Sequence, residues 1–321
     1  MVALHKDNEI YHIPNDLNKQ STLLNKFYHE KFIDLFKSNG IDYKLINYES
    51  YDGEFYIGRF AHALQDKELH SKCFDELYKH YGEKMWPNKS AYYYYDDKVR
   101  QYDLLKKFNI ETPSIICKNF DELLQNISVG KVFKSTYGAG SESVSYIWEN
   151  KQIDKLEDYI NRSYNNEDFF PCMVQDYIDV EYEYSIFISD NQLFGAKQKP
   201  NKKYSEPLAF PHPENNNDKH WLSRNKKLEI KDIDPDDLSN DFIQILITIQ
   251  KELNTPNIKF DIMDNKVLEF SYLYGGVFPI TYKTTHNYYD LKEKEWKEKP
   301  ISFYEWAYKQ ETSVLKHLGI I

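Results

Sequence analysis

Short apolar segments separated by turns dominate the C-terminal half of the sequence and constrain its fold most strongly. These segments are KVFK (131–134), VSYIW (144–148), CMVQDYI (172–178), EYSIFIS (183–189), NQLFGAKQK (191–199) and IKFDIMDNKVLEF (258–270). Asp190-Asn191 joins two of them, and Asp264-Asn265 interrupts the last one. Asp-Asn dipeptides between apolar runs are typical of β-hairpins, because both residues tolerate the backbone of a tight turn. We therefore expect short strands, several of them paired in hairpins, from residue 131 onward.

The N-terminal region begins instead with a helix followed by a strand. The segment 21–40 has apolar residues near helical spacing, and Gly40 stands where a helix C-cap belongs. IDYKLINY at 41–48 then has the composition of a strand. A helix and a strand joined by a short glycine-containing link are half of an open parallel sheet, so the predicted fold class is α/β (α+β).

Three later segments are predicted to contain helices. Asp96 or Asp97 is placed to cap a helix over 98–109, and a helix over 234–254 is predicted to be capped by an aspartate. The aromatic and charged tail at 285–311 is predicted to pack a helix back on the core. One face of the first helix is lined by Val99, Tyr102, Leu105 and Phe108.

Composition excludes several classes of protein. The chain has 321 residues, enough for two or three domains, and its aromatic content of 16% excludes a disordered chain. A formal net charge of −10 argues against a general polyanion binder, so we expect no nucleic-acid partner. Cys73, Cys117 and Cys172 form no CxxC pair, and the sequence shows neither a signal-peptide core nor a membrane-spanning stretch. We therefore expect a cytoplasmic protein.

Two lysines and a Gly/Ser-rich loop are candidates for binding phosphates. Lys98 follows two aspartates at a helix start, and Lys134 ends a strand that leads into STYGAGSES at 135–143. Backbone N–H groups of such a loop can close over phosphates, because glycine permits the required backbone angles. Taken alone, Lys98 reads better as a solvated surface lysine and the loop as an ordinary hairpin turn. The loop is not a P-loop, because GxxxxGK[ST] is absent.

Two acidic features follow. In VQDYIDVEYEYSIFI at 174–188, a short acidic link joins two strands, and the second strand begins at Glu183. The backbone of the link is a candidate for pairing with adenine, and the Glu183 carboxylate is a candidate for binding ribose hydroxyls. In FDIMDNKVLEFS at 260–271, Asp261 and Glu269 lie on adjoining antiparallel strands. A register that pairs them would place both carboxylates on one face, where they could hold Mg²⁺ together with phosphate oxygens. Each feature alone is also explained by exposed acidic side chains.

These four features, in this order, resemble the ATP-grasp superfamily. MWPN, YYDDK, VFK with GAGS, and EFSY are most similar to RimK/glutathione-synthetase-like enzymes, particularly to ATP-grasp proteins of bacterial surface-polysaccharide gene clusters. The resemblance covers about residues 85–280 and implies an ATP-grasp fold preceded by an α/β domain. The implied domains are an N-terminal pre-ATP-grasp domain (1–88), a small ATP-grasp subdomain (89–180) and a C-terminal subdomain with the carboxylates and a final helix (181–321).

The resemblance implies a role for each matching residue. The residues implied to bind ATP are Lys98, Lys134, Ser135, Thr136, Gly138, Gly140, Ser141, Ser143, Gln175, Asp176, Tyr177, Ile178 and Glu183. The lysines and the loop would contact phosphates, the segment at 175–178 would frame the adenine, and Glu183 would bind ribose. Asp261, Glu269 and Ser271 would hold Mg²⁺, although Ser271 replaces an asparagine usual in the family, which leaves the number of metal ions open. Lys199 and Lys259 would assist catalysis.

The activity implied is that of an ATP-dependent carboxylate–amine ligase, which forms an amide through an acyl phosphate. A sugar acid or an amino acid of surface-polysaccharide biosynthesis is the substrate that the resemblance suggests. Two alternatives share the same ATP site, namely a phosphotransferase and a non-catalytic nucleotide-binding partner protein. The expected cofactors are ATP and Mg²⁺. The expected partners are small carboxylate and amine substrates, sugar-linked ones included, and a second copy of the chain as a homodimer.

Overall fold

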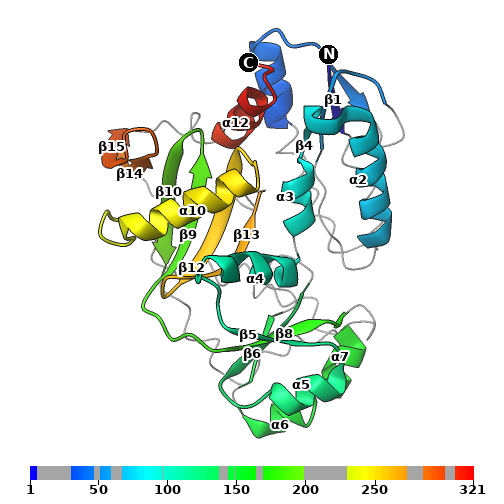
Figure 1. The fold of residues 1–321 in the computed structure, drawn as a ribbon, viewed down its shortest axis with the longest axis vertical. Coiled ribbons are helices and arrows are strands. Elements are labelled where there is room, and N and C mark those ends of the chain that lie inside the picture. Colours follow the sequence, from blue (N-terminus) through cyan, green and yellow to red (C-terminus); the bar gives the residue numbers. More distant parts are fainter. Residues whose placement is uncertain are drawn as a thin grey trace.

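The computed structural model is an α/β fold built on three β-sheets (Figure 1). The small antiparallel sheet lies at the opposite end of the molecule from the two chain ends, with the central sheet between them (Figure 1). The predicted α/β class is therefore confirmed, whereas the predicted domain boundaries stay a prediction. The structure describes residues 1–5, 30–46, 51–58, 67–95, 97–136, 144–147, 149–163, 169–198, 230–272, 285–300 and 308–321.

A parallel sheet contains the first strands of the chain. In spatial order they are β2 (Tyr43–Ile46), β1 (Val2–His5), β3 (Phe55–Ile57) and β4 (Met85–Trp86). All neighbours pair in parallel, as predicted from the helix-strand start. The helix at residues 30–38 precedes β2, and Gly40, with φ of +64°, turns the chain as the predicted C-cap. The next helices are α2 (Lys67–Tyr81), η1 (Gly82–Lys84) and α3 (Lys89–Tyr94).

Helix α4 (Lys98–Lys107) follows and lies between the central sheet and the small sheet (Figure 1). Asp97 caps it, because its side chain accepts a hydrogen bond from the backbone N–H of Arg100 at 3.1 Å. Of the residues predicted to line one face, Leu105 is buried, and Val99, Tyr102 and Phe108 are half-buried, with Phe108 packed against the core. The fully buried residues of the helix also include two polar ones that the pattern did not indicate, and they are Lys98, Gln101, Leu104 and Leu105.

The small sheet is antiparallel. In spatial order its strands are β5 (Ser114–Cys117), β8 (Cys172–Asp176), β6 (Lys131–Ser135) and β7 (Val144–Tyr146). Helices on one face bury a core that includes Phe133, Leu156 and Phe169, while the other face is turned toward the central sheet (Figure 1). These helices are α5 (Phe120–Asn126), α6 (Asn150–Ile153) and α7 (Leu156–Ser163).

The central sheet has seven strands and contains both predicted hairpins. Its order is β13 (Lys266–Ser271), β12 (Asn257–Met263), β9 (Glu183–Ser189), β10 (Gln192–Gln198), β14 (Thr285–Asp290) and β15 (Glu295–Pro300), with β11 (Ile230–Asp232) also paired to β10. Asp190, Asn191, Asp264 and Asn265 all have positive φ, between +48° and +60°. These left-handed turns explain why the Asp-Asn dipeptides predicted the hairpins correctly.

Helix α10 (Asn240–Glu252) covers one face of the central sheet, where Ile186, Leu246 and Phe260 are fully buried. The sequence predicted a helix from 234 with an aspartate cap, which was wrong at its start. The helix begins at Asn240, and Ser239 caps it by accepting from the backbone N–H of Phe242 at 3.2 Å.

The predicted helix at 285–311 was also wrong over most of its length, because residues 285–300 form the β14–β15 hairpin. Tyr289 lies opposite Trp296 in this hairpin, with ring centroids 5.7 Å apart. Such cross-strand aromatic pairs stabilise sheets. The helix of this region, α12 (Lys309–His317), begins only at Lys309.

Helix α12 packs against the parallel sheet and the central sheet together. Val314 and Leu315 contribute to the buried core of the parallel sheet, which also contains Leu4. On the other side, the side-chain amide of Asn257 donates to the carbonyl of Gln310 at 2.9 Å. None of the helices in the described residues is long and apolar enough to cross a membrane.

Candidate active site

One face of the central sheet carries a cluster of charged and polar side chains. Asp261 of β12 lies opposite Glu269 of β13 and opposite Ser185 of β9. Residues opposite each other on neighbouring strands project to the same side of a sheet. The register therefore confirms the predicted shared face of the two carboxylates. Alternation along the strands places further side chains on this face, namely Glu183, Lys259 and Ser271.

The Asp261 carboxylate is held by two neighbours. Its Oδ1 accepts a hydrogen bond from Ser185 Oγ at 2.7 Å, and its Oδ2 accepts one from Lys259 Nζ at 2.7 Å. Burial disfavours the charged ammonium of Lys259, but Asp261, Glu269 and Glu183 together outweigh this effect and raise its pKa. Lys259 is therefore a fixed cation among carboxylates, at the position predicted to assist catalysis.

Lys134 and Lys98 approach the same face from the small sheet and from α4. Lys134 is only 6% exposed, and burial lowers its pKa from 10.5 to about 8. The negative charge of Glu269 offsets part of this decrease, whereas the charge of Lys98 adds to it. Hydrogen bonds of α4 link these elements: Lys98 bonds Thr136 at the end of β6, and Gln101 bonds the backbone of Phe270 in β13. The structure thus brings together residues that the sequence separates widely.

The described part of the Gly/Ser loop is anchored at its start. The backbone N–H of Lys98 donates to the carbonyl of Thr136 at 2.9 Å, and Thr136 Oγ1 donates to the carbonyl of Pro171 at 2.8 Å. Ser135 and Thr136 are completely buried. The backbone N–H of Thr136 also bonds the carbonyl of Pro171, at 3.4 Å, so a contact of these two residues with phosphate stays a prediction. The remaining predicted loop residues, which lie outside the described residues, are Gly138, Gly140, Ser141 and Ser143.

The predicted adenine segment lies at the end of β8. Gln175 is buried and donates through Nε2 to Ser114 Oγ at 2.6 Å, whereas Asp176 is exposed and paired with Lys131. Tyr177 and Ile178 follow the strand and are half-buried. Beyond this link, Glu183 Oε2 accepts from the side-chain amide of Gln198 at 3.2 Å. The link therefore connects the small sheet to the face that carries Glu183.

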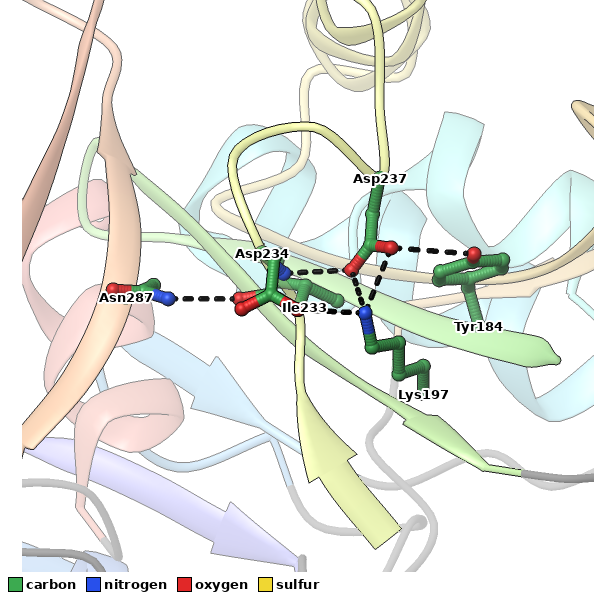
Figure 2. A network of polar contacts seen from close by, with 6 residues as sticks. All are labelled: Tyr184, Lys197, Ile233, Asp234, Asp237 and Asn287. Carbon is green, nitrogen blue, oxygen red and sulfur yellow. Dashed lines mark hydrogen bonds and ion pairs between the residues drawn. The ribbon is translucent and has the colours of Figure 1, made fainter.

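Lys199, the second predicted catalytic lysine, lies outside the described residues. Its neighbour Lys197 projects to the other face of the sheet, where its ammonium bonds Asp234 at 2.7 Å and Asp237 at 2.8 Å (Figure 2). Burial opposes the charge of Lys197, but these hydrogen bonds outweigh burial and raise its pKa. Asp237 also accepts from the Tyr184 hydroxyl (Figure 2). Lys197 therefore stabilises the link before α10 and belongs to a separate polar network.

The carboxylate pair suits a magnesium ion that also binds phosphates. Mg²⁺ is commonly held by one or two carboxylates, with substrate phosphates and water completing its octahedron. Asp261, Glu269 and the hydroxyl of Ser271 provide such an incomplete set on one face. Asp261 already binds one positive group in this structure, the ammonium of Lys259 at 2.7 Å. Within the described residues, no group of three or more acidic, histidine or cysteine side chains could bind a metal by itself.

Sequence reasoning missed two polar residues of this region. Ser185 could have been found from strand alternation, since it lies two residues after Glu183 on the same face. Gln101 gave no such signal, because a glutamine in a helix is ordinarily exposed. It is 3% exposed and its side chain bonds the backbone of Phe270, between Glu269 and Ser271.

Comparison with known proteins identifies the fold. No family model and no curated protein matches the sequence. The structure is similar to macrocyclase MdnC from Microcystis aeruginosa MRC, bound with precursor peptide MdnA (13% identity, 98% of this chain and 99% of that chain, TM-score 0.55). It is also similar to D-alanine–D-alanine ligase from Bacillus anthracis in complex with ATP (13% identity, 99% and 96%, TM-score 0.56). A third similar structure is ATP-grasp ligase PsnB with a precursor variant, Mg and ADP (12% identity, 98% and 98%, TM-score 0.55). The chain therefore has the ATP-grasp fold.

Proposed function

Starting from the ATP-grasp fold, we propose that this protein is an ATP-dependent carboxylate–amine ligase that forms an amide bond. The observation that carries the proposal is that α4 joins the lysine strand β6 to the carboxylate strand β13. Lys98 bonds the backbone of Thr136 at the end of β6, and Gln101 bonds that of Phe270 in β13. Lys134 belongs to the small sheet and Glu269 to the central sheet, so a triphosphate between the sheets would meet lysines on one side and carboxylates on the other. The three solved structures with this fold are ligases or a macrocyclase, which supports a ligase.

The proposed reaction has two steps. A carboxylate oxygen of the first substrate attacks the γ-phosphorus of ATP, which forms an acyl phosphate and releases ADP. The amine of the second substrate then attacks the carbonyl carbon, which forms the amide and releases phosphate, while the amine loses its proton to solvent. No covalent bond to the protein is required, so catalysis depends on positioning and charge.

The residues of the site divide this work. Lys98 and Lys134 bind phosphate oxygens of ATP. Lys259 stabilises the negative charge of the phosphate that is transferred. Asp261 and Glu269 would hold Mg²⁺, which when bound shields the negative charge of the phosphates. Burial of Lys134 serves this role, because a lysine in a dry environment gains more from a phosphate than an exposed lysine does.

Two classes of substrate are supported, each by a different observation. The resemblance of the motifs favours a sugar acid or an amino acid of surface-polysaccharide biosynthesis. The precursor peptides bound to MdnC and PsnB favour a carboxylate and an amine of a peptide. We propose that the substrates belong to one of these two classes. The class whose carboxylate and amine stimulate ADP release is the one that the protein uses.

The test is an acceptor-dependent ADP-release assay with product analysis by mass spectrometry. We expect ADP and phosphate to form only when a carboxylate and an amine are both present, with an amide as product. Glu269→Gln should abolish turnover, whereas Lys197→Met, on the opposite face, should retain it. A stable phosphorylated product formed from one acceptor would show a kinase instead. Unchanged turnover in Glu269→Gln would refute the site.

A further inference from the structure

The side chain of Gln101 makes a complete set of hydrogen bonds with backbone atoms. Its Nε2 donates to the carbonyl of Phe270 at 2.9 Å and to the carbonyl of Tyr94 at 2.8 Å. Its Oε1 accepts from the backbone N–H of Phe270 at 3.0 Å. Gln101 is 3% exposed, and both amide protons and the amide oxygen of its side chain are hydrogen-bonded to the protein.

These bonds act on the two peptide groups beside the candidate metal ligands. The N–H of Phe270 belongs to the peptide group that joins it to Glu269, and its carbonyl belongs to the peptide group that joins it to Ser271. Strand β13 is the edge strand of the central sheet, and on its outer side the backbone N–H of Val267 bonds the carbonyl of Ile110 at 2.7 Å. Farther along the same side, Phe270 bonds Gln101. The amide of Gln101 replaces a neighbouring strand at this point and fixes the plane of both peptide groups.

The same side chain couples the metal face to the phosphate-binding lysines. Gln101 lies one turn after Lys98 in α4, and the start of α4 is bonded to Thr136 at the end of β6. A shift of Gln101 would therefore move Glu269 relative to Lys98 and Lys134. Leucine would fill a similar volume among Leu104 and Leu105, so packing alone does not require an amide here.

We propose that Gln101 is a positioning residue for metal binding, which sets the orientation of Glu269 and Ser271 toward the phosphates of ATP. This inference rests on the proposed function, because it requires a nucleotide–metal site at these residues. Residues that orient metal ligands typically change metal affinity by about 10-fold to 100-fold when they are replaced. Nucleotide binding without metal depends on the lysines and should not change.

The test measures Mn²⁺ binding to the protein with ADP by electron paramagnetic resonance, and ADP binding without metal by calorimetry. For Gln101→Leu we expect Mn²⁺ affinity to fall by about 10-fold to 100-fold, with the metal-free ADP affinity unchanged. Gln101→Asn keeps an amide but is one methylene shorter, so it should also weaken Mn²⁺. If Gln101→Leu does not fold, the Mn²⁺ affinity of Gln101→Asn tests the proposal in its place.

The matched control is Gln152→Leu. Gln152 is also 3% exposed, and its amide also bonds backbone atoms, donating to the carbonyl of Tyr146 at 3.2 Å and accepting from the N–H of Glu149 at 3.0 Å. It lies in the small sheet region, away from β13. We expect this variant to lose stability but to keep Mn²⁺ affinity. Equal weakening in both leucine variants would mean a general loss of stability and would overturn the inference.

The remaining outcomes separate the inference from the proposed function. If the wild-type protein binds no Mn²⁺ with ADP, the proposed nucleotide–metal site fails and the inference fails with it. If the wild-type protein binds Mn²⁺ and the folded Gln101 variants bind it equally well, only the positioning role is wrong. Reduced ADP affinity without metal would place Gln101 in nucleotide binding instead and would also overturn the inference.

Discussion

Replacing Glu311 with glutamine should stabilise the protein above neutral pH. Glu311 lies in α12 with a side-chain exposure of 1%, and its Oε1 is 3.4 Å from Lys31 Nζ. Its other oxygen, Oε2, is buried and has no hydrogen-bond partner among the described residues. Burial raises the pKa of this carboxyl from 4.5 to about 7, although the charge of Lys31 opposes the increase. The folded protein therefore holds a proton that the unfolded chain releases at lower pH.

The sign and size of the effect follow from proton linkage. Between pH 4.5 and about 7 the folded state binds more protons at Glu311, so stability falls as pH rises through this interval. At about 1.4 kcal/mol per pH unit, the loss reaches about 3 kcal/mol above pH 7. Glutamine has the same shape and no charge, so Glu311→Gln should gain up to that amount at pH 8 and little at pH 4.

Urea unfolding of wild-type and Glu311→Gln proteins from pH 4 to pH 8 gives the free-energy difference at each pH. Groups that titrate in both proteins cancel in this difference, which isolates residue 311. Lys31→Met should have the opposite effect, because it removes the positive charge that favours the ionised carboxylate. A difference between wild type and Glu311→Gln that does not change with pH would refute the reasoning.

Further predictions concern the site and its surroundings. Nucleotide affinity without metal should fall as pH rises above about 8, because Lys134 then loses the proton that attracts phosphate, and Lys134→Arg should remove this decrease in a calorimetric titration. Ser185→Ala should weaken Mn²⁺ binding by about tenfold, since Asp261 loses a hydrogen bond that orients it; unchanged binding would argue against that role. Lys197→Met should lower the free energy of unfolding by about 2 kcal/mol while nucleotide binding persists; impaired binding would place Lys197 in the site.

Local turn chemistry was the most informative part of the sequence. The Asp-Asn dipeptides predicted both hairpins because residues such as Asp264 adopt a left-handed backbone with little help from the rest of the fold. The turn alone does not pair Asp261 with Glu269, because uninterrupted pairing beyond Ile262 and Val267 would place Asp261 opposite Leu268. A register shift between Asp261 and Ile262 brings the two carboxylates opposite each other, and local patterns do not predict such a shift.

The errors arose where a distant residue decides the local structure. The sequence placed the start of α10 at its run of aspartates, but Asp234 and Asp237 bond Lys197 instead of capping a helix. The burial of Gln101 in α4 was missed because its partners are backbone atoms of β13, far away in the sequence. Hydrophobic periodicity cannot report such partners, since it treats every buried position as apolar.

The contact between α12 and the parallel sheet has a consequence for how the chain folds during synthesis. The core that contains Leu4 is completed by Val314, Leu315 and Leu318, and the chain ends lie near each other (Figure 1). A growing chain therefore makes the first strand early but cannot complete the core around it until α12 has left the ribosome. In the part of the chain that the structure describes, the core of the small sheet, in contrast, consists of residues from Cys117 to Val174. We expect this internal region to become protease-resistant first, and the parallel sheet only after α12 has been synthesised.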